Sequence, residues 1–399
     1  MRILWVSPDF LHPTTRGGQV RTLEILRRLH RRHEIHFVAL NRDGSQEALV
    51  RSSEYCTRAY PVPHFVPDKP SLAFGWQLFS GLFSPLPVAI SRFRSPRMKT
   101  QIGDLLSTGN FDSLVCDFLF SAPNVPDLSR CLLFQHNVET VIWRRHAGHA
   151  SNPVSRAYLD LQARRMAVFE SDVCQRAGRV VAVSEIDAGT MRHEFGAPDV
   201  SVIATGIDLE RFAPPQPAQP VSDLVFVGSM DWLPNIDGIE YFVREILPLI
   251  RARRPHTTLV VAGRKPSTRV RRMAGGDGRL QVTGTVPDIR PYLWGARVSI
   301  VPLRIGGGTR LKIYEAMAAG LPVVSTSVGA EGLALEPGRH LAIADTPEEF
   351  AGRCLRLLAD DAERTRMVQA AYEVIASRFS WETVCAQFEE ILRRGPRPC

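Results

Sequence analysis

The chain has 399 residues, 44% of them hydrophobic and 23% charged, which is typical of a soluble globular protein and too long for one ordinary core. Its net charge of +8 rests almost entirely on arginine and favours phosphorylated ligands or anionic lipid over acidic partners. No basic run is interleaved with aromatic residues, so nucleic acid is not predicted as a partner.

The cysteines and the apolar segments indicate the compartment. The seven cysteines are scattered without a Cys-x-x-Cys pair, which fits a reducing environment. The N-terminus lacks the long apolar region of a signal peptide, and no apolar run is long enough to span a membrane. The sequence therefore predicts a cytoplasmic protein.

The first half of the chain alternates short apolar runs with helical patterns. A buried strand is predicted at residues 2–7 and a helix at about 19–31, with Gly17 and Gly18 at the start of that helix. These glycines would let the backbone approach a phosphate or a sugar, and an ordinary glycine-containing loop is the equal alternative. Further strands are expected at residues 34–40, 113–116, 131–134, 180–183 and 200–203.

Two features of this half each allow two interpretations. His136 follows the strand at 131–134, and open parallel sheets bind ligands at the carboxyl ends of their strands, although a lone histidine is more often structural. Residues 71–99 are aromatic and apolar and end in several basic residues. They form either a core helix with its loop, which we favour, or an interfacial contact with a membrane or an acceptor lipid.

A proline-rich stretch, residues 214–220, is the clearest domain boundary. A new buried strand at 224–227 follows it, and Gly228 opens the loop after that strand. Further strands are expected at 258–262, 280–282 and 298–303, and helices at 236–251, 347–366 and 381–394. The chain is therefore predicted as two α/β domains, residues 1–213 and 222–378, with a C-terminal helix, 379–394, that packs back on the first domain.

A glycine loop follows the strand at 298–303. Gly306, Gly307 and Gly308 remove every side chain between this strand and the next helix, and Thr309 is expected to cap that helix. Bare backbone N–H groups at a helix N-terminus make a site for an anion.

The first turn of that helix carries Arg310 and Lys312, where the helix dipole disfavours cations. Two cations beside three glycines predict a bound polyanion, and Glu315 lies one turn further, within reach of ribose or sugar hydroxyls. The alternative is a tight turn with a solvated basic helix start.

Together these features resemble the GT-B glycosyltransferases, specifically the large retaining family numbered four. The resemblance runs through most of the chain and is strongest from about 180 to 327. The motifs that carry it are Gly17-Gly18, Gln135-His136-Asn137 and residues 182–185, 205–212, 226–231, 284–288 and 306–322.

The resemblance implies two Rossmann-like domains that face each other across a cleft, with the acceptor on the first and a nucleotide sugar on the second. Glu315 should then hold the ribose hydroxyls, while Arg310 and Lys312 face the diphosphate. The loop around Val286 should line the base, and Gly228 should lie beside the donor.

The first domain should contribute His136 near the reacting sugar, with Gly17 and Gly18 closing over the phosphates. The implied reaction is transfer of a hexose to a saccharide or lipid-linked acceptor with retention of configuration and without a metal or other cofactor. No Asp-x-Asp pair stands in a suitable loop, and no enzyme nucleophile is evident. Attack by the acceptor hydroxyl on the donor's front side is therefore expected, with a donor phosphate oxygen taking the proton.

Two departures from the family pattern change the expected site. Many members carry a glutamate eight positions before the residue matching Glu315, where this chain has Gly307. Many also carry an arginine and a lysine in the loop that Gly228 opens, where this chain has neither. We infer that Arg310 and Lys312 replace those cations and that glycine amides replace the carboxylate. The pattern resembles a subgroup common in bacterial envelope and exopolysaccharide synthesis, where peripheral contact with the inner membrane is an open alternative.

Other functions remain open at this stage. A non-catalytic nucleotide-sugar-binding scaffold protein would also fit the glycine at position 307, and an epimerase of the same fold would share both domains. A dinucleotide enzyme would need a Gly-x-Gly-x-x-Gly pattern after its first strand, which residues 7–18 lack.

Overall fold

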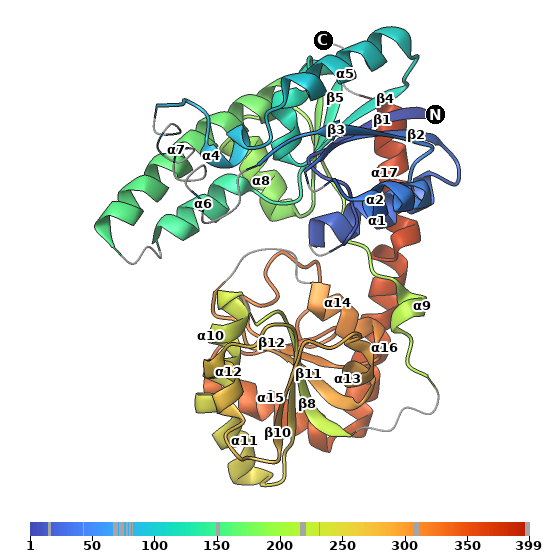
Figure 1. The fold of residues 1–399 in the computed structure, drawn as a ribbon. Coiled ribbons are helices and arrows are strands. Elements are labelled where there is room, and N and C mark those ends of the chain that lie inside the picture. The colour runs from blue at the N-terminus through green and yellow to red at the C-terminus, as the bar shows by residue number, and fades with distance from the viewer. Residues whose placement is uncertain are drawn as a thin grey trace. The chain divides into compact units, whose positions relative to one another are not determined.

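The computed structural model describes residues 1–14, 17–42, 44–66, 71, 76, 79, 81, 83–148, 152–215, 221–230, 232–305 and 311–395. The chain divides into two compact domains, Met1–Ala204 with Val384–Cys399, and Thr205–Thr383. Figure 1 shows that each domain is built on its own sheet with helices packed on both faces. The prediction of two Rossmann-like α/β domains is confirmed.

Seven parallel strands form the sheet of the first domain, in the order β3-β2-β1-β4-β5-β6-β7. The strand order reverses at β1 and β4, so the carboxyl ends of these two strands border the crevice where such sheets bind ligands. The strands are β1 (Arg2–Ser7), β2 (Glu34–Asn41), β3 (Arg58–Pro63), β4 (Ser113–Asp117), β5 (Cys131–Phe134), β6 (Arg179–Ala182) and β7 (Val200–Val202).

The first-domain helices cover strands that are buried on both faces, which is why β1, β4 and β5 read as continuous apolar runs. The helices are α1 (Gly17–Leu29), α2 (Gln46–Val50), α4 (Val88–Ser91), α5 (Pro96–Thr108), α6 (Glu139–Gly148), α7 (Pro153–Arg176), α8 (Glu185–His193) and α17 (Trp381–Arg394). Short 3₁₀ turns occupy Arg51–Glu54, Leu119–Asn124 and Leu128–Arg130.

The last helix, α17, contributes to the core of the first domain. The ring of Phe388 lies 5.7 Å from Trp5 of β1 and 5.1 Å from Phe134 of β5, and all three side chains are buried. Ser380 precedes the helix and accepts a hydrogen bond from the backbone N–H of Thr383, as its sequence position predicts.

Six parallel strands form the sheet of the second domain, in the order β10-β9-β8-β11-β12-β13, and the order reverses at β8 and β11. The strands are β8 (Ser222–Val227), β9 (Leu259–Ala262), β10 (Leu280–Gly284), β11 (Ala296–Val301), β12 (Val323–Ser325) and β13 (Ala342–Ile343). The helices are α9 (Leu209–Phe212), α10 (Leu233–Tyr241), α11 (Leu247–Arg253), α12 (Thr268–Met273), α13 (Arg290–Trp294), α14 (Leu311–Ala318), α15 (Pro347–Ala359) and α16 (Asp361–Arg378).

Residues 347–366 are helical as predicted, but they belong to two helices, α15 and α16, with a break between them. The first helix ends before Asp360, whose backbone is extended and whose side chain accepts a hydrogen bond from Glu363 N to cap α16. The predicted helix at 236–251 is also interrupted, by a π-helical turn at Phe242–Ile246. Pro248 lies in the first turn of α11, two residues after the π-helical turn, and cannot donate a backbone hydrogen bond.

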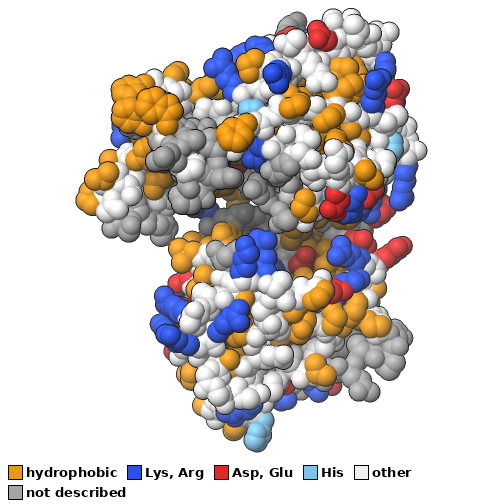
Figure 2. All heavy atoms as spheres, viewed as in Figure 1, with side chains coloured by type: hydrophobic (Ala, Val, Ile, Leu, Met, Phe, Trp, Pro, Cys, Tyr) orange, Lys and Arg blue, Asp and Glu red, His pale blue; other side chains and the backbone are white. Residues whose placement is uncertain are grey.

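The described part of the segment 71–99 has an exposed aromatic side. Trp76 and Phe79 have ring centroids 5.8 Å apart, Phe79 and Phe83 5.6 Å, and all three side chains are more than half exposed. Figure 2 shows hydrophobic side chains gathered at the surface of the first domain near α4. Among the helices that the structure describes, none has both the length and the apolar character that crossing a bilayer requires.

Candidate functional site

His136 lies in a buried polar cluster at the carboxyl ends of β4 and β5. Its Nε2 lies 2.7 Å from Oδ1 of Asp117, and its Nδ1 lies 2.9 Å from a guanidinium nitrogen of Arg21 in α1. None of the three residues is more than 3% exposed. Arginine can only donate hydrogen bonds, so Nδ1 must accept and Nε2 must carry the proton that it donates to Asp117.

The cluster keeps the imidazole ring neutral and fixed. Burial lowers the pKa of His136, and the charge of Asp117 opposes that shift. Burial also lowers the pKa of Arg21, to about 10, where it remains charged at neutral pH. With both ring nitrogens engaged, His136 is arranged to orient its surroundings and not to exchange a proton. That His136 lies near the reacting sugar stays a prediction from the family resemblance.

Gly18 is required by the packing around this cluster. A Cβ at Gly18 would lie 2.7 Å from the Phe118 ring and 3.4 Å from His136. Phe118 stacks on the imidazole with centroids 3.9 Å apart and has a φ of 61°, a conformation that non-glycine residues rarely adopt. Gly17 is the first residue of α1 and is exposed, and residues 15 and 16 before it are outside the described ranges.

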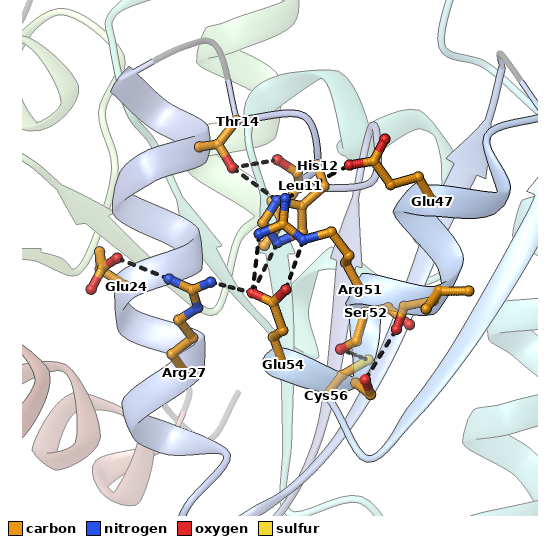
Figure 3. A network of polar contacts seen from close by, with 12 residues as sticks. Leu11, His12, Thr14, Glu24, Arg27, Glu47, Arg51, Ser52, Glu54 and Cys56 are labelled. Atoms are coloured by element: carbon orange, nitrogen blue, oxygen red, sulfur yellow. Dashed lines mark hydrogen bonds and ion pairs between the residues drawn. The ribbon is translucent and has the colours of Figure 1, made fainter. Parts of the chain in front are cut away.

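An ion-pair network anchors the loop between β1 and α1, which leads to these glycines (Figure 3). Glu54 accepts hydrogen bonds from Arg27 of α1 and Arg51, and its carboxylate lies 3.3 Å from His12 of the loop. The hydrogen bond from Arg51 is the largest cause that lowers the pKa of Glu54, to about 2. Thr14 Oγ1 donates to the backbone carbonyl of Leu11 and so closes the loop on itself.

Two carboxyl groups, those of Glu139 and Glu170, lie at the start of α6, which follows the loop that contains His136. Glu170 of α7 is fully buried and accepts hydrogen bonds from the backbone N–H groups of Glu139 and Thr140, at 3.0 and 2.7 Å, and from the Thr140 hydroxyl. It thus caps α6 from a neighbouring helix. Burial raises the pKa of Glu139 and of Glu170 to about 7. Because Glu170 has donors on both oxygens, the proton that the pair retains near neutral pH lies mainly on Glu139.

This pair predicts a pH-dependent stability. A carboxyl group with a raised pKa in the folded state stabilises the fold below its unfolded pKa near 4.5, and this stabilisation is lost as the pH rises through about 7. Glu139→Gln removes the second charge, so the variant should be more stable than wild type by roughly 1–3 kcal/mol at pH 8 and nearly equal at pH 5.

Thermal unfolding at the two pH values measures this difference. Glu194→Gln, which changes an exposed carboxylate paired with Arg144, is the control and should behave alike at both pH values. An equal shift of the melting temperature for Glu139→Gln at pH 5 and pH 8 would contradict the assignment of the proton.

In the second domain, Lys312 of α14 reaches the carboxyl end of β8. Its Nζ donates a hydrogen bond of 2.6 Å to Oδ1 of Asn235 and lies 4.6 Å from the centre of the Phe226 ring. A Cβ at Gly228 would lie only 3.0 Å from this Nζ. The structure therefore brings Gly228 and Lys312 together at the point where the strand order reverses.

Gly228 also lies against a second glycine, at the end of β9. A Cβ at Gly263 would lie 1.7 Å from the carbonyl oxygen of Gly228, and Gly228 N donates to Ala262 O at 3.0 Å. The two loops can approach this closely only because no side chain stands between them.

Glu315 follows Lys312 by one turn of α14 and is half-buried. Burial raises its pKa, and the charges of Lys312 and Arg211 oppose the shift. Within the described ranges its carboxylate has no hydrogen-bond or ion-pair partner. Arg290, which pairs with Asp288, donates to the carbonyl of Arg211 at 3.0 Å and so ties the loop that contains Val286 to α9.

Val286 itself is half-buried and follows β10. The remaining predicted residues, Gly306, Gly307, Gly308, Thr309 and Arg310, lie outside the described residues, so their roles stay predictions. In the described part of the chain, no group of three or more His, Cys, Asp or Glu residues could hold a metal ion.

Sequence reasoning missed Asp117 and Asn235. Both are buried polar residues whose partners lie far away in the sequence. Asp117 ends β4 and contacts His136, and Asn235 lies in the first turn of α10 and contacts Lys312. Position after a buried strand was the only available signal for Asp117.

Comparison with known proteins gives matches over most of the chain. A family described as "Glycosyltransferase Family 4" matches residues 15–211, and one described as "Glycosyl transferases group 1" matches residues 221–360. A phosphatidyl-myo-inositol mannosyltransferase of Mycolicibacterium smegmatis is 26% identical over 87% of this chain and 89% of its own length. A glycogen synthase of Mycobacterium tuberculosis is 27% identical over 63% of this chain, which spans only 62% of that relative.

Solved structures resemble the whole chain. Sucrose-phosphate synthase from Thermosynechococcus elongatus has a TM-score of 0.68 at 17% identity and covers 99% of this chain and 98% of its own. Anabaena HepE in complex with UDP has a TM-score of 0.67 at 14% identity, covering 99% and 100%. At these identities the structures establish the likeness of fold alone.

Proposed function

The chain belongs to family 4 of the glycosyltransferases and has their two-domain GT-B fold, and on this premise we propose that it is a retaining hexosyltransferase that needs no metal ion. The proposed donor is a nucleotide sugar, and the proposed acceptor is a saccharide or a lipid-linked saccharide. The proposed pathway is bacterial envelope or exopolysaccharide synthesis, since relatives include a protein encoded in a Klebsiella pneumoniae cps region, 20% identical over 88% of this chain.

One observation carries the proposal: the ammonium of Lys312 lies at the carboxyl end of β8, beside Gly228 and at the reversal of strand order. Departure of a nucleoside diphosphate leaves developing negative charge on its phosphate oxygens. A cation fixed at this point interacts more strongly with the charge that develops as the bond between sugar and phosphate breaks than with the intact donor. It therefore stabilises the transition state more than the bound donor. Lys312 thus supplies from α14 the charge that many family members carry in the loop after β8.

Glu315 complements this role. Its carboxylate is half-buried, lies one turn from Lys312 and has no partner among the described residues, so it suits the hydroxyls of a ribose. In the first domain, the neutral His136 ring would orient the sugar or the acceptor without exchanging a proton, and the acceptor proton would pass to a donor phosphate oxygen.

Calorimetric titration of UDP and GDP tests the site. Lys312→Ala should weaken binding of the preferred nucleotide at least about tenfold, because a charge-assisted contact to phosphate is lost. Glu315→Ala should have a similar effect through the ribose. Arg356→Ala, a surface cation of α15 paired with Glu363, is the control and should bind normally. Unchanged affinity in both site variants would exclude this site.

A panel of nucleotide sugars then distinguishes the activities. Transfer or slow hydrolysis of one donor supports the transferase, and conversion of a donor to its epimer without an acceptor supports the epimerase alternative. Tight nucleotide binding with no turnover of any donor, with and without saccharide acceptors, would favour the scaffold alternative.

Peripheral contact with the inner membrane remains part of the proposal. The exposed aromatic side chains of Trp76, Phe79 and Phe83 support it. Co-sedimentation with vesicles of anionic lipid, compared with vesicles of neutral lipid, measures it, and recovery of all protein in the supernatant would rule it out.

A further inference from the structure

We infer that Asn235 is a positioning residue that holds the ammonium of Lys312 where the donor diphosphate binds. The inference rests on the proposed function, because it concerns the same nucleotide site. It adds a residue from the first turn of α10, which follows the loop after β8 where many family members carry cations that this chain lacks.

The side-chain amide of Asn235 is used at both ends. Its Oδ1 accepts the hydrogen bond from Lys312 at 2.6 Å, and its Nδ2 donates to the carbonyl oxygen of Ser229 at 2.9 Å. The residue is only 3% exposed, so solvent does not compete for these contacts. The donor to Ser229 fixes which way the amide faces, and its oxygen therefore points at Lys312.

Phe226 and Gly228 also help to hold the Lys312 ammonium in place. The Phe226 ring lies 4.6 Å from Nζ, a distance at which an aromatic face attracts a cation. A Cβ at Gly228 would lie 2.7 Å from Asn235 Nδ2 and 3.0 Å from Lys312 Nζ. Any side chain at Gly228 would therefore displace the contact between Asn235 and Lys312.

A neutral partner has a specific consequence for binding. An aspartate at position 235 would hold Lys312 equally near, but its charge would offset the positive potential offered to an anion. It would also turn a carboxylate oxygen toward the Ser229 carbonyl, which can only accept a hydrogen bond. Asparagine fixes the direction of the lysine without adding a negative charge beside it.

A double-mutant cycle tests the inference, with UDP, GDP and the matching nucleosides titrated against each protein. Lys312→Ala and Asn235→Ala should each weaken nucleoside diphosphate binding, the first at least about tenfold and the second about fivefold. The double variant should be no more than about twofold weaker than Lys312→Ala alone, because Asn235 acts through the lysine. Affinity for uridine or guanosine should change in none of them.

Asn235→Asp and Glu240→Gln complete the design. The aspartate variant should lose diphosphate affinity at least as strongly as Asn235→Ala. Glu240→Gln, on the same helix but paired with Arg269 of α12, is the control and should bind like wild type.

The outcomes separate the two proposals. Unchanged diphosphate binding in Lys312→Ala would remove the proposed site itself. If Lys312→Ala weakens binding, the inference is overturned by normal binding in Asn235→Ala, by independent effects that multiply in the double variant, or by an equal loss of nucleoside affinity. The last result would mean that Asn235 only supports the fold of the loop.

Discussion

Replacing Asp117 by alanine is expected to lower the free energy of unfolding of the first domain by about 3–5 kcal/mol. Asp117 is fully buried and accepts hydrogen bonds from His136 at 2.7 Å and from Thr22 at 2.9 Å. Its charge also stabilises the buried guanidinium of Arg21, so alanine leaves a cation and two donors without this carboxylate.

Chemical denaturation, with hydrogen exchange of β1, β4 and β5 to locate the change, measures the effect. Asp172→Ala is the matched control, because Asp172 forms an exposed ion pair with Arg176 of the same helix at 3.0 Å. This control should change stability by less than about 0.5 kcal/mol. A loss of stability in Asp117→Ala as small as that in the control would mean that the buried cluster does not hold the first domain together.

Gly263→Ala is expected to destabilise the second domain by about 3 kcal/mol or more and to abolish measurable nucleotide binding. The new Cβ would lie 1.7 Å from the Gly228 carbonyl oxygen, and backbone atoms cannot rotate away as a flexible side chain can. Relief of this contact must separate the ends of β8 and β9 and so displace Gly228 from Lys312.

Gly352→Ala provides a control of opposite sign. Gly352 is exposed in the interior of α15, and a Cβ there meets nothing within 4 Å. Alanine at this position should stabilise the domain by about 0.5–1 kcal/mol through helix propensity. For Gly263→Ala itself, normal nucleotide affinity and unchanged hydrogen exchange would contradict the prediction. They would show that the loops after β8 and β9 accommodate the new side chain.

Much of the fold could be predicted because buried parallel strands have a strong local signal. The apolar runs of β1, β5 and β8 identify these strands within one or two residues. β3 gave no such signal, since Arg58–Pro63 contains two prolines. The structure explains their presence: β3 pairs only with β2, at the edge of the sheet, where a missing backbone donor is tolerated.

Asp360 shows a different kind of failure. The helical pattern continues across it, so the prediction that residues 347–366 are helical does not mark the break between α15 and α16. Aspartate is also a strong N-cap, and Glu363 supplies the backbone N–H that it accepts. The spacing of apolar residues reveals the buried face of a helix. It does not reveal where one helix ends when the next begins at once and continues the same spacing.

The candidate site was only partly predictable, since its contacts are between distant residues. Lys312 was identified from its place in a helix N-terminus, but nothing near it in the sequence names Asn235 as its partner. His136 was identified from the end of its strand, while the residues that fix its tautomer come from β4 and α1. Such pairings are set by the order of strands in the sheet, which only the fold supplies.

The packing of Phe388 against Trp5 and Phe134 also sets an order of events during synthesis. The ribosome makes β1 and β5 early, but the helix that covers their aromatic residues emerges only after the whole of Thr205–Thr383. Until then the nascent first domain exposes an apolar surface on the side that α17 will occupy. The first domain can therefore complete its core only after the second domain has been synthesised.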